Sequence, residues 1–119
     1  MKNELTDNEY GIVDNTLESL ALHSNMLPVR DDCEIFYSDK EKCGSYSWLS
    51  DTICLPNTPG VLPERIPTIV HELVHRQQRK RYGLLKYTLL SCRFWQAQTS
   101  LEKEAVAAYN LAETLMIEL

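Results

Sequence analysis

Two histidines and a glutamate stand at a spacing that lets them act on one metal ion. Residues 70–75 read VHELVH, so His71 and His75 are four positions apart and Glu72 directly follows the first histidine. Side chains at positions i and i+4 of a helix lie on one face, so both imidazoles can bind the same ion. Glu72 is offset by one residue, so its carboxylate can stand beside an attacking water without binding the metal. The pattern predicts one zinc ion per chain, with His71 and His75 as ligands and Glu72 as general base.

A third zinc ligand has to come from elsewhere, because catalytic zinc usually has three protein ligands and one open position. The chain has neither an acid nor a histidine between His75 and Leu101. The downstream acids are Glu102, Glu104, Glu113 and Glu118. Upstream, His23 and the early acids are the alternatives.

Helix geometry ranks these downstream acids. Apolar residues at helical spacing form one face of the last segment: Leu101, Ala105, Ala108, Ala112 and Leu115. At about 100° per residue, Glu104 lies roughly 60° from the centre of this face, and Glu102 lies about 100° away on the other flank. Glu104 is therefore favoured as the third ligand, with Glu102 as the alternative. Either acid can also be a first-turn residue that the helix dipole favours.

The histidine motif requires a helix, and its neighbours predict one over residues 63–82. The apolar positions in this segment have helical spacing: Ile66, Ile69, Val70, Leu73 and Val74. A proline stands at its start and Gly83 is suited to its end. A connecting helix is expected over residues 84–94, and a third helix, capped by Ser100, from Leu101 nearly to the end.

The N-terminal half predicts one helix and a small sheet. Residues 7–25 read as a helix capped by Asp7, with an apolar stripe at Val13, Leu17, Leu20 and nearby Leu22. Short segments with strand character follow at 33–37, 45–49 and 52–55. They predict a small, mainly antiparallel three-stranded sheet. The order of helix, sheet and three helices predicts an α+β fold.

The composition predicts one globular domain over residues 1–119. The chain is 44% hydrophobic and 24% charged, which is typical of a soluble folded protein. No apolar stretch approaches the roughly 20 residues that a membrane span needs. The N-terminus is acidic and polar and does not read as a signal peptide. A cytoplasmic protein without a membrane partner is the default expectation.

Charge is distributed unevenly along the chain. The net charge is −5, yet six bases and no acid occur from Arg76 to Arg93. A basic block can attract an anionic partner. The acidic total argues against a nucleic-acid partner, so we interpret the block as solvated helix faces.

The four cysteines do not form a zinc-finger pattern. No CxxC pair occurs among them: Cys33, Cys43, Cys54 and Cys92. Without a signal peptide, the default is four reduced thiols. A disulfide among the first three stays open if the protein works in an oxidising compartment.

The motif and its context resemble the gluzincins, metallopeptidases with HExxH and a glutamate on a later helix. In size and order the chain is most similar to their smallest members, the minigluzincins, with HELVHRQQ and LEKEAVAAYN as the two matching helices. The resemblance implies a minimal zincin-like domain with one zinc ion. It implies His71, His75 and Glu104 (alternatively Glu102) as ligands and Glu72 as the base.

The resemblance also implies how a substrate would bind. An extended peptide would add to an exposed edge strand just before the active helix, which here means Thr52, Ile53, Cys54 and Leu55. Tyr109, or alternatively Tyr82, is the candidate for stabilising the transition state, although packing aromatics are the favoured interpretation of both. Some gluzincins have an acid four residues after the ligand glutamate, but this chain has Val106 or Ala108 there. A partner that steadies a zinc-binding imidazole must therefore come from elsewhere.

Two functions follow from these observations. The first is a zinc-dependent metallopeptidase that hydrolyses a peptide or protein substrate. The alternative is a zinc-stabilised module without activity, serving as a structural or interaction component of a larger assembly such as a phage particle, and so associated with a virion. The small size and the basic block motivate this alternative. A metal-free module that binds nucleic acid is the third and least favoured interpretation.

Overall fold

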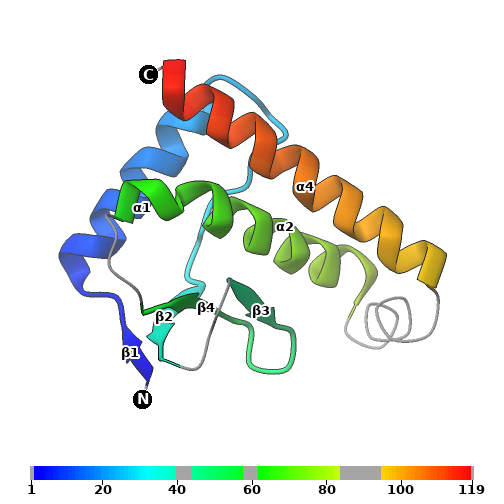
Figure 1. Ribbon diagram of the computed structural model, residues 1–119, viewed down its shortest axis with the longest axis horizontal. Coiled ribbons are helices and arrows are strands. Elements are labelled where there is room, and N and C mark those ends of the chain that lie inside the picture. Colours follow the sequence, from blue (N-terminus) through cyan, green and yellow to red (C-terminus); the bar gives the residue numbers. More distant parts are fainter. Residues whose placement is uncertain (1, 40–43, 58–61, 84–94, 119) are drawn as a thin grey trace.

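The computed structural model describes residues 2–39, 44–57, 62–83 and 95–118. Within these residues the chain forms three α-helices and one four-stranded sheet, so the α+β prediction is confirmed. Figure 1 shows helix α2 lying between the sheet and helix α4. The predicted connecting helix at 84–94 lies outside the described residues. No described helix is long and apolar enough to cross a membrane.

Helix α1 spans Asp7–Ala21 and supplies one wall of the core. Its cap is Thr6 and not Asp7: the Thr6 hydroxyl accepts from the Glu9 N–H, and the Glu9 carboxylate accepts from the Thr6 N–H. This reciprocal capping box satisfies two backbone donors, whereas capping by Asp7 would satisfy one. The predicted apolar stripe is buried at Val13, Leu17 and Leu20, but Leu22 lies beyond the end of the helix and is exposed. The helix ends four residues before the predicted end at residue 25.

The sheet is larger than predicted and mixed. Its strands are β1 (Lys2–Glu4), β2 (Glu34–Ser38), β3 (Ser45–Ser47) and β4 (Thr52–Pro56), in the order β1-β2-β4-β3. Strands β2 and β4 pair in parallel, and the other two pairings are antiparallel. Strand β1 is polar and three residues long, so its sequence carries no apolar alternation. The three-stranded, mainly antiparallel prediction is therefore wrong in strand number and in the central pairing.

The predicted edge strand 52–55 is not at an edge. Strand β4 pairs with β2 on one side and with β3 on the other. Its residues 53–56 are buried, as expected for a strand in the middle of a sheet. The hairpin that connects β3 to β4 folds β3 outward, so β4 inserts between β2 and β3. The edge strand beside the helices is therefore β3.

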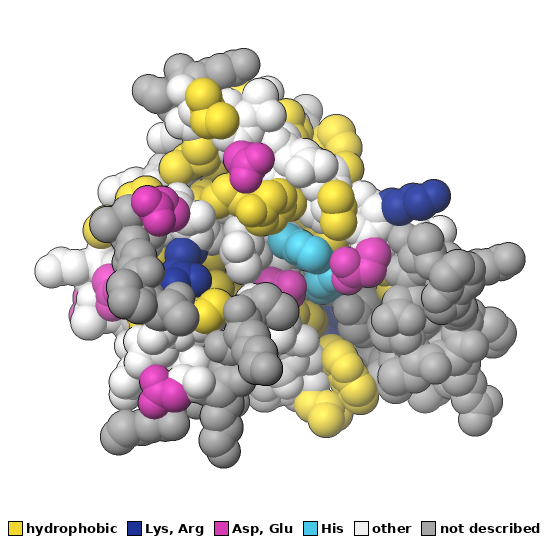
Figure 2. Space-filling view, viewed as in Figure 1, with side chains coloured by type: hydrophobic (Ala, Val, Ile, Leu, Met, Phe, Trp, Pro, Cys, Tyr) yellow, Lys and Arg dark blue, Asp and Glu magenta, His cyan; other side chains and the backbone are white. Residues whose placement is uncertain are grey.

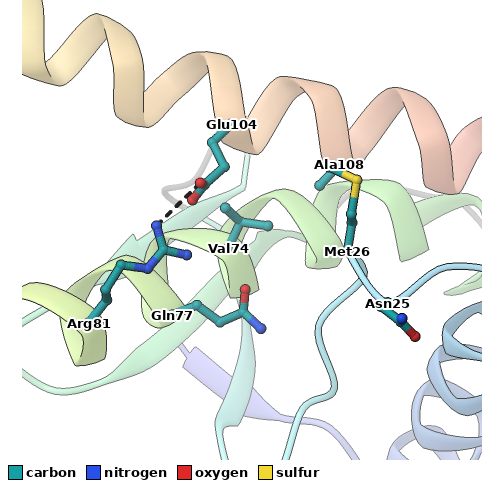
Figure 3. A pocket seen from close by; sticks show the side chains of 7 residues that line it. All are labelled: Asn25, Met26, Val74, Gln77, Arg81, Glu104 and Ala108. Atoms are coloured by element: carbon teal, nitrogen blue, oxygen red, sulfur yellow. Dashed lines mark hydrogen bonds and ion pairs between the residues drawn. The ribbon is translucent and has the colours of Figure 1, made fainter.

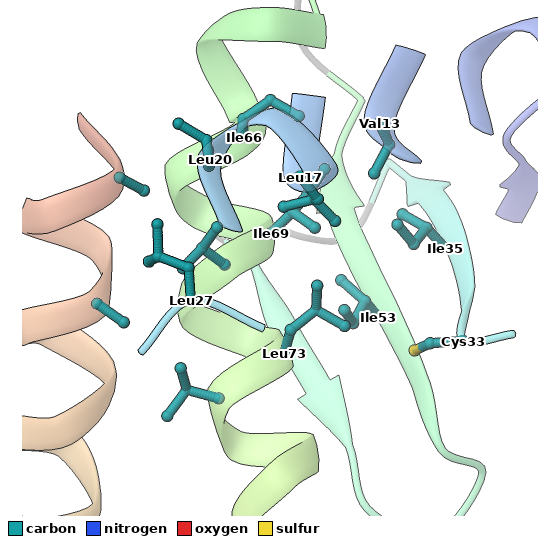
Figure 4. Close-up of a cluster of buried hydrophobic side chains, with 14 of the residues drawn as sticks. Val13, Leu17, Leu20, Leu27, Cys33, Ile35, Ile53, Ile66, Ile69 and Leu73 are labelled. Atoms are coloured by element: carbon teal, nitrogen blue, oxygen red, sulfur yellow. The ribbon is translucent and has the colours of Figure 1, made fainter. Parts of the chain in front are cut away.

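Helix α2 spans Ile66–Tyr82 and carries the histidine motif. A short 3₁₀ helix, η1 (Leu62–Arg65), leads into it. Gly83 ends it as predicted, with a φ of 80° that most other residues disfavour. Figure 4 shows Ile66, Ile69 and Leu73 of α2 among the buried side chains of α1 and the sheet. The apolar face of α2 is thus packed on the core. This packing determines where the remaining faces of the helix, including the histidines, point.

Helix α4 spans Trp95–Glu118 and packs against α2. It begins before Ser100, so that serine lies within the helix and is not its cap. A serine hydroxyl can bond to the backbone of its own helix, which makes it an ambiguous cap signal. The predicted packing face is buried at Leu101, Ala105, Ala108 and Ala112. Because three of these residues are alanine, the two helices can approach each other closely.

Candidate metal centre

Three side chains from α2 and α4 bring their donor atoms together. The Nε2 atoms of His71 and His75 are 3.3 Å apart. The Glu102 carboxylate lies across the helix interface, with Oε1 2.8 Å from His75 Nε2 and Oε2 3.4 Å from His71 Nε2. All three residues offer ligand atoms within 4.8 Å of one another. The predicted i, i+4 histidine pair therefore points at one place, and α4 supplies a carboxylate there.

Two of the three separations between the donor atoms suit a tetrahedral zinc site. Nitrogen and oxygen ligands lie about 2.0–2.1 Å from zinc, so two ligands of a tetrahedral ion are roughly 3.3–3.4 Å apart. The distances of 3.3 Å between the imidazoles and 3.4 Å from His71 to Glu102 match this value, whereas the 2.8 Å from His75 to Glu102 is shorter and is a hydrogen-bond distance. Two imidazoles and one carboxylate are also a donor set that catalytic zinc uses. The residues present therefore fit a zinc ion by number and type, and in two of the three separations between their donor atoms.

The structure places Glu102, and not the favoured Glu104, beside the histidines. Glu104 instead lies toward the C-terminal end of α2, where its Oε2 accepts a hydrogen bond from Arg81 at 3.3 Å (Figure 3). Its Oε1 accepts from Gln78 Nε2 at 3.0 Å. The sequence ranking used only the angular distance of each glutamate from the buried face of α4, but both flanks of that face border α2. Which flank lies next to the histidines depends on how α2 and α4 cross. The angles around a single helix carry no information about that crossing.

The sequence nevertheless contains a signal that favours Glu102. Tyr109 and Glu102 are seven residues apart, so they lie within about 20° of one another around a helix. Glu104 lies roughly 140° from Tyr109 by the same geometry, so Glu104 and Tyr109 are poorly placed to serve one site. In the structure the Tyr109 ring meets the His71 ring edge-on, with 6.5 Å between centroids. Glu102 and Tyr109 therefore mark the same flank of α4.

A hollow of about 370 Å³ opens next to the histidines. The residues lining it are Gly44, Pro56, Arg65, Thr68, His71, Glu72 and Tyr109. Glu72 is only 6% exposed, so its carboxylate is held among protein atoms at the edge of this hollow. Figure 2 shows histidine side chains reaching the surface next to acidic ones. The predicted base and the predicted transition-state residue thus line the same space as His71.

A close approach of the sheet to α2 shapes this hollow. Gly44 precedes β3, and a Cβ at this position would overlap Thr68 Cγ2 of α2. The same Cβ would stand 3.7 Å from Glu72 Cγ. A glycine is therefore required at position 44 because a Cβ would not fit against α2, and not because the backbone adopts a positive φ. It brings the edge strand β3 alongside the residues expected to act on a substrate.

The environment of His71 favours a neutral ring. Burial lowers the pKa of His71, the neighbouring His75 lowers it further, and Glu102 opposes both effects. An imidazole must be neutral at the nitrogen that binds a metal. The local electrostatics thus favour the form of His71 that can act as a ligand.

A buried arginine next to the motif ties α2 to the loops of the sheet. Arg76 is 5% exposed, and its guanidinium donates to Asp51 at 3.0 Å and to Asp32 at 3.1 Å. Asp51 also accepts a 2.6 Å hydrogen bond from the Tyr46 hydroxyl. Three described bases of the basic block, Arg76, Lys80 and Arg81, face carboxylates. This part of the block is a structural element of the fold.

The described cysteines are separate from the histidines. Cys33 and Cys54 are both buried free thiols. Burial raises the pKa of Cys33 to about 11, so this thiol is protonated at neutral pH. Cys43 and Cys92 lie outside the described residues. Neither described cysteine joins the cluster of His71, His75 and Glu102.

The sequence interpretation missed Gln78, a buried polar residue on the same helix. Its Oε1 lies 2.9 Å from His75 Nδ1, the ring nitrogen that faces away from the cluster. The available signal was a glutamine three residues after the second histidine, a spacing that places both on one helix face.

Comparisons with protein-family models, curated proteins and solved structures find no match. The resemblance to the gluzincins accordingly stays a prediction from the two motifs.

Proposed function

We propose that this chain is a zinc-dependent peptidase, with His71, His75 and Glu102 as the zinc ligands. The observation that carries the proposal is the convergence of these three donors, one of which, His71, lines the same hollow as Glu72. Two imidazoles and a carboxylate leave one position of a tetrahedral ion open, as catalytic zinc requires. A structural zinc site would usually offer four protein ligands.

The chain's own residues supply the proton transfer and charge stabilisation that peptide hydrolysis needs. A bound zinc ion contributes a Lewis acid that polarises a carbonyl and lowers the pKa of water to about 7. The Glu72 carboxylate takes the proton of the attacking water and returns it to the leaving amine. The Tyr109 hydroxyl donates a hydrogen bond to the oxyanion that develops on the carbonyl. The shared hollow makes these roles compatible with one bound peptide.

Strand β3 replaces residues 52–55 as the proposed substrate-binding strand. Within the described residues, β3 (Ser45–Ser47) pairs with β4 only, so its outer backbone groups face away from the sheet. An extended peptide can add to such an edge through main-chain hydrogen bonds. The close approach at Gly44 would hold the peptide near Glu72.

Hydrolysis of a peptide library tests this proposal. The zinc-loaded protein should cleave a subset of peptides, and Glu72→Gln should abolish cleavage while retaining zinc. Equal background cleavage by the two proteins would overturn the peptidase assignment. If zinc binding persisted in that case, the result would favour a zinc-stabilised module of a larger assembly.

A further inference from the structure

Gln78 is fully buried, and both ends of its amide have partners: Nε2 contacts α4, and Oε1 contacts His75 within α2. Its exposed fraction is 0%, and its Nε2 donates to the Leu101 carbonyl at 2.9 Å and to Glu104 Oε1 at 3.0 Å. Its Oε1 lies 2.9 Å from His75 Nδ1. A buried amide in an exposed-looking stretch of sequence (RQQRK) would be costly without these partners.

The partners fix which way the amide points. Leu101 offers a backbone carbonyl and Glu104 a carboxylate, and both groups only accept hydrogen bonds. The NH₂ group of Gln78 must therefore face α4, because a reversed amide would place its oxygen against two acceptors. The amide oxygen then faces His75, where it can only accept.

The fixed amide in turn fixes the proton on His75. Since Gln78 Oε1 only accepts, it stabilises a hydrogen on the Nδ1 atom of His75. In a neutral imidazole this leaves the lone pair on Nε2, the atom that faces His71 and Glu102. We propose that Gln78 is a positioning residue that holds the His75 proton on Nδ1 and so presents Nε2 to the metal. This inference rests on the proposed zinc site.

Glu102 makes this role necessary. Its Oε1 lies 2.8 Å from His75 Nε2, so in the metal-free protein the carboxylate favours a proton on the very atom that must bind zinc. Gln78 stabilises the opposite tautomer. The same amide also binds the Leu101 carbonyl, one residue before Glu102. Gln78 thus orients the ring of the proposed ligand His75 and also holds the backbone next to the proposed ligand Glu102.

Nitrogen NMR of the His75 ring in metal-free protein tests this role without zinc. The spectra are recorded at alkaline pH, where a histidine is neutral. Wild type should show a protonated Nδ1 and an unprotonated Nε2. Gln78→Met, which has similar length and no hydrogen-bonding amide, should move the proton toward Nε2. Gln77→Met at the adjacent exposed position is the matched control and should leave the tautomer unchanged.

Zinc titration of the same proteins gives the second readout. Loss of such an outer partner typically weakens metal binding by about 10- to 100-fold. We expect a loss of that size in Gln78→Met and less than about threefold in Gln77→Met, with thermal unfolding showing that both variants are folded. A wild-type His75 protonated on Nε2, or a tautomer and affinity unchanged in Gln78→Met, would overturn the role of Gln78. Failure of wild type to bind zinc would overturn the proposed function, whereas the tautomer measurement would still decide this inference.

Discussion

Exchanging Glu102 for glutamine should weaken zinc binding strongly, while the same exchange at Glu104 should not. Structural zinc sites bind with about 10–16 kcal/mol from four protein ligands, so one ligand contributes roughly 2.5–4 kcal/mol. At about 1.4 kcal/mol per tenfold, this corresponds to roughly a 60- to 700-fold change in the dissociation constant. The Glu102 side chain is 50% exposed, so water can occupy its place. We therefore expect Glu102→Gln to fall near the lower end, at about a hundredfold.

Glu104→Gln is the matched control for this experiment. Its oxygen can still accept the hydrogen bond from Gln78, and only the half-exposed ion pair with Arg81 is lost. Exposed pairs of this kind contribute about 0–1 kcal/mol. Competition between each protein and a chromophoric chelator gives the two dissociation constants. Equal losses in both variants, or a larger loss in Glu104→Gln, would refute the assignment of Glu102.

Three further predictions follow from the site and its supports. Gly44→Ala should destabilise the fold by about 1–3 kcal/mol because its methyl overlaps Thr68 Cγ2; denaturant unfolding checks this, and adding Thr68→Ser should restore most of the loss. Tyr109→Phe should lower kcat/KM by roughly 10²- to 10³-fold with unchanged zinc affinity; peptide kinetics that match wild type would contradict its role. Burial opposes ionisation of Asp51, but hydrogen bonds from Tyr46 and Arg76 outweigh it and place the pKa of Asp51 below 3.8. That carboxylate therefore stabilises the fold above pH 3.8, and the stabilisation is lost as pH falls through the lowered pKa. Asp51→Asn should lower the free energy of unfolding by about 2 kcal/mol at pH 7, and asparagine tolerates the φ of 56° at this position. The deficit should shrink in unfolding measurements near pH 3. A deficit that does not change with pH would argue against a stabilising role of the Asp51 charge.

The histidine helix could be predicted because its signals are local. The spacing of His71 and His75, the apolar stripe and the stop at Gly83 all lie within about five turns of one helix. The packing face of α4 was predictable for the same reason. These features depend on the 3.6-residue period and on little else.

The sheet and the third ligand could not be predicted in the same way, because both depend on contacts between distant segments. Strand β1 pairs through its backbone, and its three residues (KNE) give no apolar signal. The position of β4 between β2 and β3 depends on which side the hairpin folds. The choice between Glu102 and Glu104 likewise depends on how α4 crosses α2, although the seven-residue spacing to Tyr109 contained part of the answer.

X-ray absorption at the zinc edge of the purified, zinc-loaded protein tests the proposed metal centre. We predict one zinc ion per chain, bound only by nitrogen and oxygen atoms at about 2.0–2.1 Å, with imidazole scattering from two histidines. Replacing His75 with alanine should remove the bound metal. Sulfur ligands at about 2.3 Å would place the zinc on the cysteines instead, and a protein that retains no zinc would contradict the metal centre altogether.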